Sequence, residues 1–398
     1  MNHLRLFILT LCLLGLTVAP AQVEPLGPNA QISVITCGPG TDLYAQFGHS
    51  AFRVRDPDSG IDWVYNYGTF DFDTPNFYMK FARGKLQYAL SRSTFAAFLY
   101  TYQLESRWVR EQLLGLDPGQ RMALFRFLEE NNRPENRYYQ YDFLYENCAT
   151  KIPEVLTDVL GTNLVLDPGF ASGGESFRDL IQQNLQSNTW SSLGIDLALG
   201  AVVDRVAEPY EYRFLPENVR LLIQNTTLDG QPLSPRERVI LDLPNPKYEL
   251  YLTATPLFWC LLLLVFTATI SWIDYRNGSR SRLLDFLLFL LTGLAGLLIG
   301  FLWFFTDHTS TVWNFNILWA FPVNIALAFV LLKDQRPDPR LQGYLIGLLA
   351  LIGCCLLLWA TGLQEFHPIV SVIWAALALR YLLLLQQLRR AKPLKRPQ

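Results

Sequence analysis

The stretch LLDFLLFLLTGLAGLLIGFLWFF, residues Leu283–Phe305, decides the architecture of this chain, because it is almost wholly apolar and long enough to cross a membrane as a helix. A helix needs about 20 residues to cross the hydrocarbon core of a bilayer. The sequence therefore predicts an all-α domain of five membrane-spanning helices over residues 251–388. The other four apolar stretches are Leu252–Ile273, Trp313–Leu332, Leu341–Ala360 and Ile369–Leu385.

The charges between these stretches predict how the helices are oriented. The loops after the first and third predicted spans carry Lys and Arg, and so does the C-terminal tail, residues 389–398. The loops Thr306–Val312 and Thr361–Pro368 carry neither. Because positively charged loops stay in the cytoplasm, these two loops and everything before the first span are predicted to lie outside it.

The N-terminus predicts export independently of the loop charges. Arg5 precedes the apolar run Leu6–Val18, and Ala19-Pro20-Ala21 fits the rule for signal-peptide cleavage. Residues 1–21 are thus predicted to be a signal peptide, and residues 22–250 an exported domain. An uncleaved anchor would export the same segment.

Composition and charge exclude several classes of function. With 33 Lys and Arg against 35 Asp and Glu, the chain is close to neutral, which argues against a nucleic-acid partner. No Cys or His spacing typical of a metal site occurs, so neither a metal nor an organic cofactor is predicted.

The exported segment mixes strand and helix patterns and predicts an α+β domain. Ile32–Cys37 is a predicted strand, and Ser50–Arg55 and Ile61–Tyr67 form a predicted hairpin around the turn Asp56–Gly60. Asp117-Pro118 is a typical helix start.

Two further segments of the exported domain carry predictions. A second helix is predicted from Asn147 to Leu160, although Pro153 should kink it. The segment Phe214–Lys247 is rich in Pro, Asn and Asp and is predicted to be a surface link to the membrane domain.

One histidine and two cysteines remain in this domain once the signal peptide is removed: His49, Cys37 and Cys148. The cysteines could pair as a disulfide, or one could be buried while the other works as a thiol. Capping by Asn147 would place Cys148 in the first turn of a helix, where the free N–H groups favour a thiolate. A thiol with a histidine base is the pair that nucleophilic acyl transfer needs, while the alternative is a buried cysteine and a structural histidine.

Several motifs together resemble the Lnb family over nearly the whole mature chain. They are Phe47-Gly48-His49-Ser50-Ala51-Phe52-Arg53-Val54, Val64-Tyr65-Asn66-Tyr67-Gly68-Thr69-Phe70, Asn147-Cys148-Ala149-Thr150, Gly194-Ile195-Asp196-Leu197-Ala198-Leu199-Gly200, and Asp307-His308 with Asn314-Phe315-Asn316-Ile317-Leu318-Trp319. Lnb proteins are lipoprotein N-acyltransferases of the bacterial inner membrane, with a periplasmic domain similar to papain-like thiol enzymes. The order of His before Cys also resembles the permuted papain-like group that includes the NlpC/P60 enzymes and lecithin:retinol acyltransferase.

The resemblance implies a reaction and two catalytic roles. Cys148 would be the nucleophile and His49 the base, as in the permuted group. An acyl chain would pass from a phospholipid donor, through a thioester on Cys148, to the N-terminal amine of a diacylglyceryl-cysteine lipoprotein. The alternatives are a membrane-tethered cell-wall thiol peptidase or amidase, and a non-enzymatic membrane assembly or binding protein.

The group that orients His49 is expected across the predicted hairpin. Folding the hairpin about Asp58 puts Tyr67 opposite His49 and Asn66 beside it. Asn66 is preferred because its amide oxygen can accept from the imidazole, although strand parity favours Tyr67. Alternatively, Asn66 only satisfies backbone groups at the end of the strand.

Polar residues predicted at the outer face of the membrane are candidates for substrate binding. Asp307 and His308 are expected to help bind or deprotonate the acceptor amine. Asn314 and Asn316 either join helices by hydrogen bonds or line a site open to the outer leaflet. Arg83 and Lys85 could meet a lipid phosphate, or could be a solvated basic edge.

Overall fold

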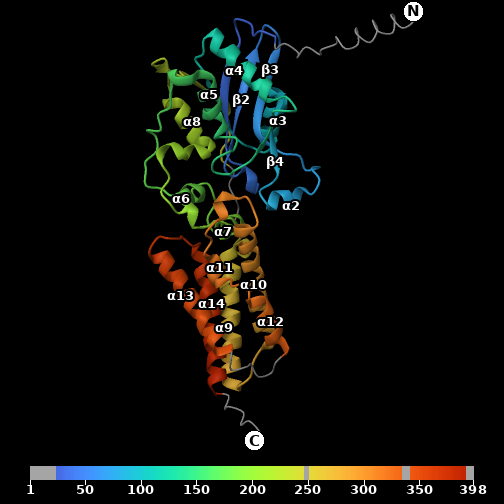
Figure 1. Ribbon diagram of the computed structural model, residues 1–398, viewed down its shortest axis with the longest axis vertical. Coiled ribbons are helices and arrows are strands. Elements are labelled where there is room, and N and C mark those ends of the chain that lie inside the picture. Colours follow the sequence, from blue (N-terminus) through green and yellow to red (C-terminus); the bar gives the residue numbers. More distant parts are fainter. Residues whose placement is uncertain (1–23, 246–250, 334–340, 391–398) are drawn as a thin grey trace, which may run out of the picture.

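A computed structural model describes residues 24–245, 251–333 and 341–390 of the chain. The molecule is elongated, with a mixed α/β domain at one end and a bundle of long helices at the other (Figure 1). The predicted signal peptide, residues 1–21, lies outside the described residues, as does most of the basic tail.

The N-terminal domain is built on one antiparallel sheet of seven strands, in the order β10-β5-β1-β2-β3-β4-β6. The predicted hairpin is confirmed, because β2 and β3 pair directly across a short turn. The strands are β1 Gln31–Cys37, β2 His49–Asp56, β3 Ile61–Thr69, β4 Gln87–Thr94, β5 Val109–Leu113, β6 Tyr138–Gln140 and β10 Arg236–Leu241.

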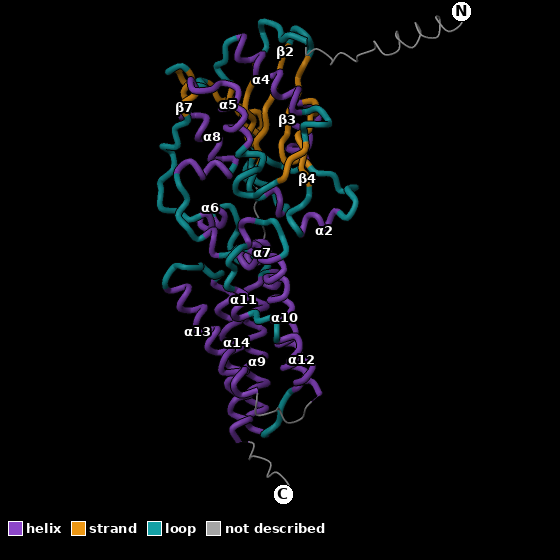
Figure 2. The backbone as a smooth tube through the Cα atoms, viewed as in Figure 1, coloured by secondary structure: helices purple, strands orange, loops and turns teal. Residues whose placement is uncertain are grey.

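Helices cover both faces of this sheet (Figure 2). Helices α4 (Pro118–Asn131), α5 (Lys151–Leu160) and α8 (Pro216–Asn225) pack on one face, and α3 (Phe95–Leu104) packs on the other. The alternation of side chains along the strands allows this, since β1, β2 and β3 each carry buried apolar side chains on both faces. Each fully buried large apolar side chain contributes about 1.5–3 kcal/mol to the stability of the fold.

The prediction for residues 214–247 as a surface link is wrong for the part that the structure describes. Val219, Leu222 and Ile223 are buried under the sheet from helix α8, and β10 is the edge strand beside β5. The Pro and Asn residues indicated loop, but apolar residues three and four apart gave this segment a helical face to bury.

Helix α5 begins later than the sequence predicts. The regular helix starts at Lys151, so Pro153 lies in its first turn and does not kink it. The N–H groups of a first turn have no partner within the helix, so a proline costs little there.

Shorter elements fill the space between the sheet and the membrane helices. Leu180, Val203 and Phe214 are members of one buried cluster there. These elements are α2 Phe77–Ala82, α6 Phe177–Gln182, α7 Trp190–Ala198 and the 3-10 segments Ala201–Val203 and Pro209–Phe214. A small sheet of β7 Leu164–Val165, β8 Thr227–Leu228 and β9 Gln231–Pro232 lies instead toward the end of the domain remote from the membrane helices (Figure 2).

Within the described residues, five apolar helices are long enough to span a membrane, which confirms the predicted number. The third one is broken near Pro322 into two parts, which the sequence analysis did not predict. Gly293 and Gly296 face the break, and a side chain on Gly296 would lie 1.6 Å from the carbonyl oxygen of Ala320. The helices are α9 Pro256–Asn277, α10 Arg282–Phe304, α11 Asn316–Trp319 with α12 Asn324–Lys333, α13 Leu341–Ala360 and α14 Pro368–Arg390.

A buried ion-pair network joins three of these helices near the end of the bundle remote from the sheet. The guanidinium of Arg380 on α14 donates to Asp285 on α10 at 2.6 Å and to Asp274 on α9 at 2.7 Å. All three side chains are almost fully buried. Charges at this depth are stable only when paired, so the network fixes the packing of α9, α10 and α14.

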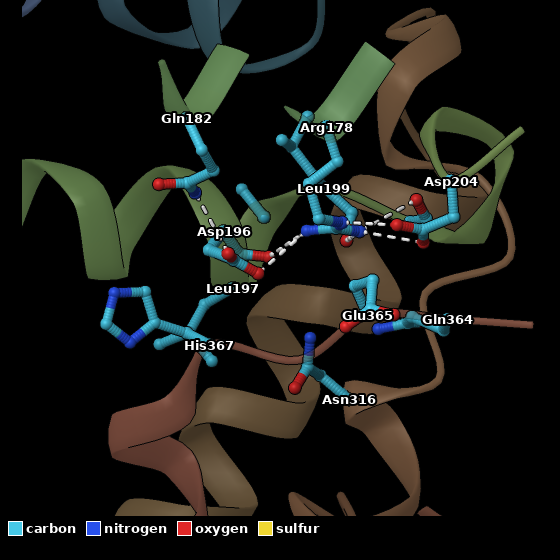
Figure 3. Close-up of polar contacts among 12 residues, drawn as sticks. Arg178, Gln182, Asp196, Leu197, Leu199, Asp204, Asn316, Gln364, Glu365 and His367 are labelled. Atoms are coloured by element: carbon cyan, nitrogen blue, oxygen red, sulfur yellow. Dashed lines mark hydrogen bonds and ion pairs between the residues drawn. The ribbon is translucent and has the colours of Figure 1, made fainter. Parts of the chain in front are cut away.

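A second buried network fastens the N-terminal domain to the membrane helices. Figure 3 shows the guanidinium of Arg178 on α6 between the carboxylates of Asp196 and Asp204, at 2.7 and 2.6 Å. The loop before α14 closes this network, since the N–H of Glu365 donates to Asp204.

Backbone contacts join the same two parts of the chain. The N–H of Gly200 donates to the carbonyl of Ser310 at 2.9 Å, and a side chain on Gly200 would collide with Val312. The Gly194–Gly200 motif therefore docks the N-terminal domain on the outer loops.

We expect Arg178→Met to lower the free energy of unfolding by roughly 3–5 kcal/mol, because it leaves two carboxylates buried without their cation. The matched control is Arg205→Met, which removes an exposed ion pair with Glu211 worth about 0–1 kcal/mol. Tryptophan fluorescence during thermal unfolding in detergent measures both. Equal shifts in the two variants would contradict the role of Arg178.

Candidate active site

His49 is the first residue of β2, and its ring contacts the neighbouring strand. Its Nε2 lies 3.2 Å from Oδ1 of Asn66 on β3. An amide oxygen only accepts hydrogen bonds, so Nε2 carries the proton and Nδ1 keeps its lone pair. Burial lowers the pKa of His49 to about 4, so the ring is neutral at physiological pH and able to accept a proton.

The register of the hairpin separates the two candidates for orienting His49. Phe52 pairs with Tyr65, and continuing this register puts Gly68 rather than Tyr67 opposite His49. The expected pairing of Tyr67 with His49 is thus wrong by one residue. Tyr67 points into the core against helix α5, and its buried hydroxyl has no hydrogen-bond partner. The ring of His49 therefore hydrogen-bonds to Asn66 and not to Tyr67.

A tightly bonded turn just before α5 carries Cys148. The side-chain oxygen of Asn147 accepts from the N–H groups of Ala149 at 2.8 Å and Thr150 at 3.0 Å. Its amide nitrogen donates to the carbonyls of Phe143 at 2.7 Å and Phe214 at 3.0 Å. Asn147 therefore caps this turn as expected, although the regular helix starts three residues after Cys148.

The thiol of Cys148 lies against the ends of β2 and β3, at Ser50, the residue that follows His49, and at Gly68. The N–H of Ser50 points at its sulfur. Gly68 has a φ of 87°, and a side chain there would lie 3.6 Å from the Cβ of Cys148. The imidazole of His49 hydrogen-bonds to Asn66 and not to the thiol of Cys148. Cys148 and His49 both keep part of their surface exposed.

Burial sets the charge state of the thiol. It raises the pKa of Cys148, and the N–H groups of Ser50 and Cys148 oppose this rise. The resting site therefore contains a neutral thiol and a neutral imidazole. A helix N-terminus would favour a thiolate, but desolvation is the larger effect here.

Cys37 is the second cysteine of this domain and lies opposite His49 in the pairing of β1 with β2. Its side chain is almost completely buried, and burial raises its pKa to about 12. Both cysteines are free, so of the two alternatives the structure has one buried cysteine and one accessible thiol.

Arg107 is a buried cation near the site that the sequence analysis missed. Its Nε donates to the carbonyl of Gly38 at 2.7 Å, and its Nη1 pairs with Glu105 at 2.8 Å. Its charge lowers the pKa of both Cys148 and His49, so it favours a thiolate and a neutral base. No local pattern around Arg107 indicates this, because only the fold brings it to the end of β1.

The outer loop between α10 and α11 reaches the same end of the sheet. The hydroxyl of Thr309 donates to Asp142 at 2.6 Å, in the segment that leads to Cys148. Nε2 of His308 bonds to the carbonyl of Phe81 at 3.2 Å, and Asp307 lies 3.8 Å from Lys85. The side chain of Arg83 is exposed nearby. Four residues predicted from distant parts of the chain therefore form one group: Asp307, His308, Arg83 and Lys85.

Asn314 and Asn316 do not belong to that group. Asn314 is fully buried and donates to the carbonyls of Leu197 at 2.8 Å and Ala198 at 3.1 Å. Asn316 accepts from the indole of Trp319 at 2.8 Å. Their prediction as substrate-binding residues is therefore corrected, because they are enclosed and join elements of the protein, which was the alternative interpretation.

The chemistry available at this site is nucleophilic. A half-buried cysteine with backbone N–H groups close to its sulfur lies at the same end of the sheet as a neutral imidazole that an amide orients. Within the described part of the chain, no group of three or more His, Cys, Asp or Glu residues is arranged to hold a metal ion. The arrangement suits attack on an acyl carbon followed by release of the acyl group to a second nucleophile.

Comparisons with known proteins give two matches, one for each part of the chain. Residues 27–183 match the family described as Lnb N-terminal periplasmic domain, and residues 248–391 match the one described as Lnb transmembrane domain. The first description agrees with the outer side that the loop charges predict for this domain. No curated protein and no solved structure matches the chain.

We expect the rate at which iodoacetamide alkylates Cys148 to rise about tenfold per pH unit from pH 6 to pH 9, because its raised pKa keeps the thiol neutral over this range. Peptide mass spectrometry of the folded protein measures the rate. Cys37 is the internal control and should react only after denaturation. A plateau near pH 7 would instead show a thiolate–imidazolium pair.

Proposed function

The chain belongs to the Lnb family, and on this premise we propose that it is a lipoprotein N-acyltransferase of the bacterial inner membrane. The observation that carries the proposal is that the free, half-buried Cys148 lies at the strand ends, against Ser50 and Gly68, where the His49–Asn66 pair also lies. A phospholipid would be the acyl donor and the amine of a diacylglyceryl-cysteine lipoprotein the acceptor.

In the first half of the reaction, Cys148 attacks the ester carbon of the phospholipid while its proton passes to Nδ1 of His49. The N–H groups of Ser50 and Cys148, which lower the pKa of the thiol, would donate to the oxyanion that forms. The C–O bond then breaks, and His49 returns the proton to the leaving oxygen. A lysophospholipid departs, and the acyl chain remains as a thioester.

In the second half, the lipoprotein amine attacks the thioester carbon and loses one proton to His49. The C–S bond breaks, the proton returns to the sulfur, and the N-acylated lipoprotein leaves. The neutral resting state of His49 suits both halves, because the ring must begin each one as a base.

The position of the site supports substrates that remain in the membrane. Outer-loop residues Thr309 and His308 contact the domain that carries Cys148. We infer that Asp307 and His308 help to bind the acceptor amine, and that Arg83, whose side chain is exposed, meets a lipid phosphate. Lys85 pairs with Asp307, so it contributes less than Arg83 to binding a lipid phosphate.

The arrangement also supports the permuted papain-like fold as a proposal. A cysteine before a helix that packs on an antiparallel sheet, with the histidine on a strand of that sheet, is what this fold requires. The histidine precedes the cysteine in the chain, which is the permuted order.

We expect Cys148→Ala to abolish N-acylation of lipoproteins while leaving the chain folded, because no other thiol replaces the nucleophile. Mass spectrometry of lipoprotein N-termini in cells that depend on this protein measures the product. Cys354→Ala, which changes an exposed cysteine in a membrane helix, should keep full activity. Full N-acylation by the Cys148→Ala protein would refute the proposal, and muropeptide release by the wild-type protein would favour a peptidase.

The two candidates for orienting His49 can be separated by a matched pair of variants. Asn66→Ala removes the acceptor at Nε2 and should lower turnover on the order of tenfold to a hundredfold. Tyr67→Phe removes an unpartnered hydroxyl and should leave turnover unchanged. Steady-state transfer in detergent with a diacylglyceryl-peptide measures both, and the reverse ranking would exclude Asn66.

A further inference from the structure

Residues 70–86, between β3 and β4, form an arm that projects to the side of the molecule just above the membrane helices (Figure 1). The arm contains helix α2 and exposes four large apolar side chains to solvent. The exposed fractions are 81% for Tyr78, 68% for Phe72, 59% for Met79 and 51% for Phe81.

The exposure does not come from a loose segment. Phe77 is buried and packs against Phe70 and Phe72, with ring centroids 5.7 and 4.8 Å apart. Gln140 donates to the carbonyl of Gly84 at 2.6 Å. The arm is therefore held in place while its outer side chains have no protein to cover them.

The arm lies close to the outer end of a membrane-spanning helix. Helix α10 ends at Phe304, and the N–H of Asp307 donates to the carbonyl of Arg83 at 2.9 Å. Three residues of chain reach at most about 10 Å, and one headgroup layer is roughly 5–8 Å thick, so the arm lies at the level of this layer or just above it. Gly84 allows this approach, since a side chain there would lie 3.1 Å from the N–H nitrogen of His308.

The composition of the arm suits a lipid surface. Tyr78 and Phe81 are three residues apart and share a face of α2, and Met79 lies next to them. Lys80, Arg83 and Lys85 add positive charge within the same short segment. Aromatic side chains with neighbouring basic groups are typical of elements that lie in the headgroup layer of a membrane.

We propose that this arm lies in the headgroup layer of the outer leaflet, with Tyr78, Met79 and Phe81 against the acyl boundary and Arg83 beside lipid phosphates. We infer that the partner of the arm is a lipid surface, because the bilayer that surrounds α10 would extend sideways to the arm. The contact goes beyond the proposed function and does not require it.

The same arm connects the lipid surface to the site. Phe70 begins the arm two residues after Gly68, which contacts Cys148. Its ring also packs on Tyr88 of β4, with centroids 5.3 Å apart. A lipid held at the arm would therefore lie next to the strand ends that position the thiol.

The test places a photoreactive amino acid on the arm of the full-length protein. p-Benzoyl-phenylalanine replaces Tyr78, and the protein is irradiated in phospholipid nanodiscs, after which mass spectrometry finds peptides that carry a phospholipid. The matched control replaces Val165 of β7, which is 58% exposed at the end of the domain remote from the membrane (Figure 2). We expect roughly tenfold or more lipid adduct at position 78 than at position 165.

Equal adduct at the two positions, or attachment of position 78 to protein instead of lipid, would overturn the proposal. The experiment is repeated with Cys148→Ala in the same chain. The lipid adduct should persist there, so that failure of the membrane contact and failure of acyl transfer are distinguishable.

Discussion

Arg178 is a buried cation held between Asp196 and Asp204, and the placement of the candidate active site depends on this arrangement. The network lies where α6 and α7 meet the outer loops of the membrane helices (Figure 3). Charges in such a place are stable only with their partners and in one geometry. The network therefore fixes α6 and α7 relative to each other, at the place where the N-terminal domain meets the loop before α14.

The site combines opposing electrostatic effects. Burial favours the neutral forms of both Cys148 and His49, while the N–H of Ser50 and the charge of Arg107 favour the thiolate. A neutral resting pair is less reactive toward water and oxidants than a thiolate. In a periplasmic domain, the neutral form makes the Cys148 thiol less prone to oxidation.

Glycines allow the close approaches that assemble the functional parts. Gly68 brings β3 against Cys148, and Gly200 lets the N-terminal domain contact the outer loop. Gly296 gives room to the break in the third span. At Gly200 and Gly296 a side chain would enter space that another part of the chain occupies, while Gly68 has a positive φ that other residues rarely adopt.

The sequence by itself determined the five spans, their orientation, the β2–β3 hairpin and the choice of Cys148 and His49 as candidates. These features follow from local properties: the length of an apolar run, loop charge, strand alternation, and the few thiols and imidazoles in the exported segment. Only the tertiary structure decided the rest. The choice of Asn66 over Tyr67 depends on the register of β2 and β3, which differs by one residue from the expected one. Packing between distant segments decides three other features: the enclosure of Asn314 and Asn316, the burial of Arg107 and the folding of residues 214–245. Such contacts leave no local pattern, because the energy that fixes them comes from burial and pairing in three dimensions.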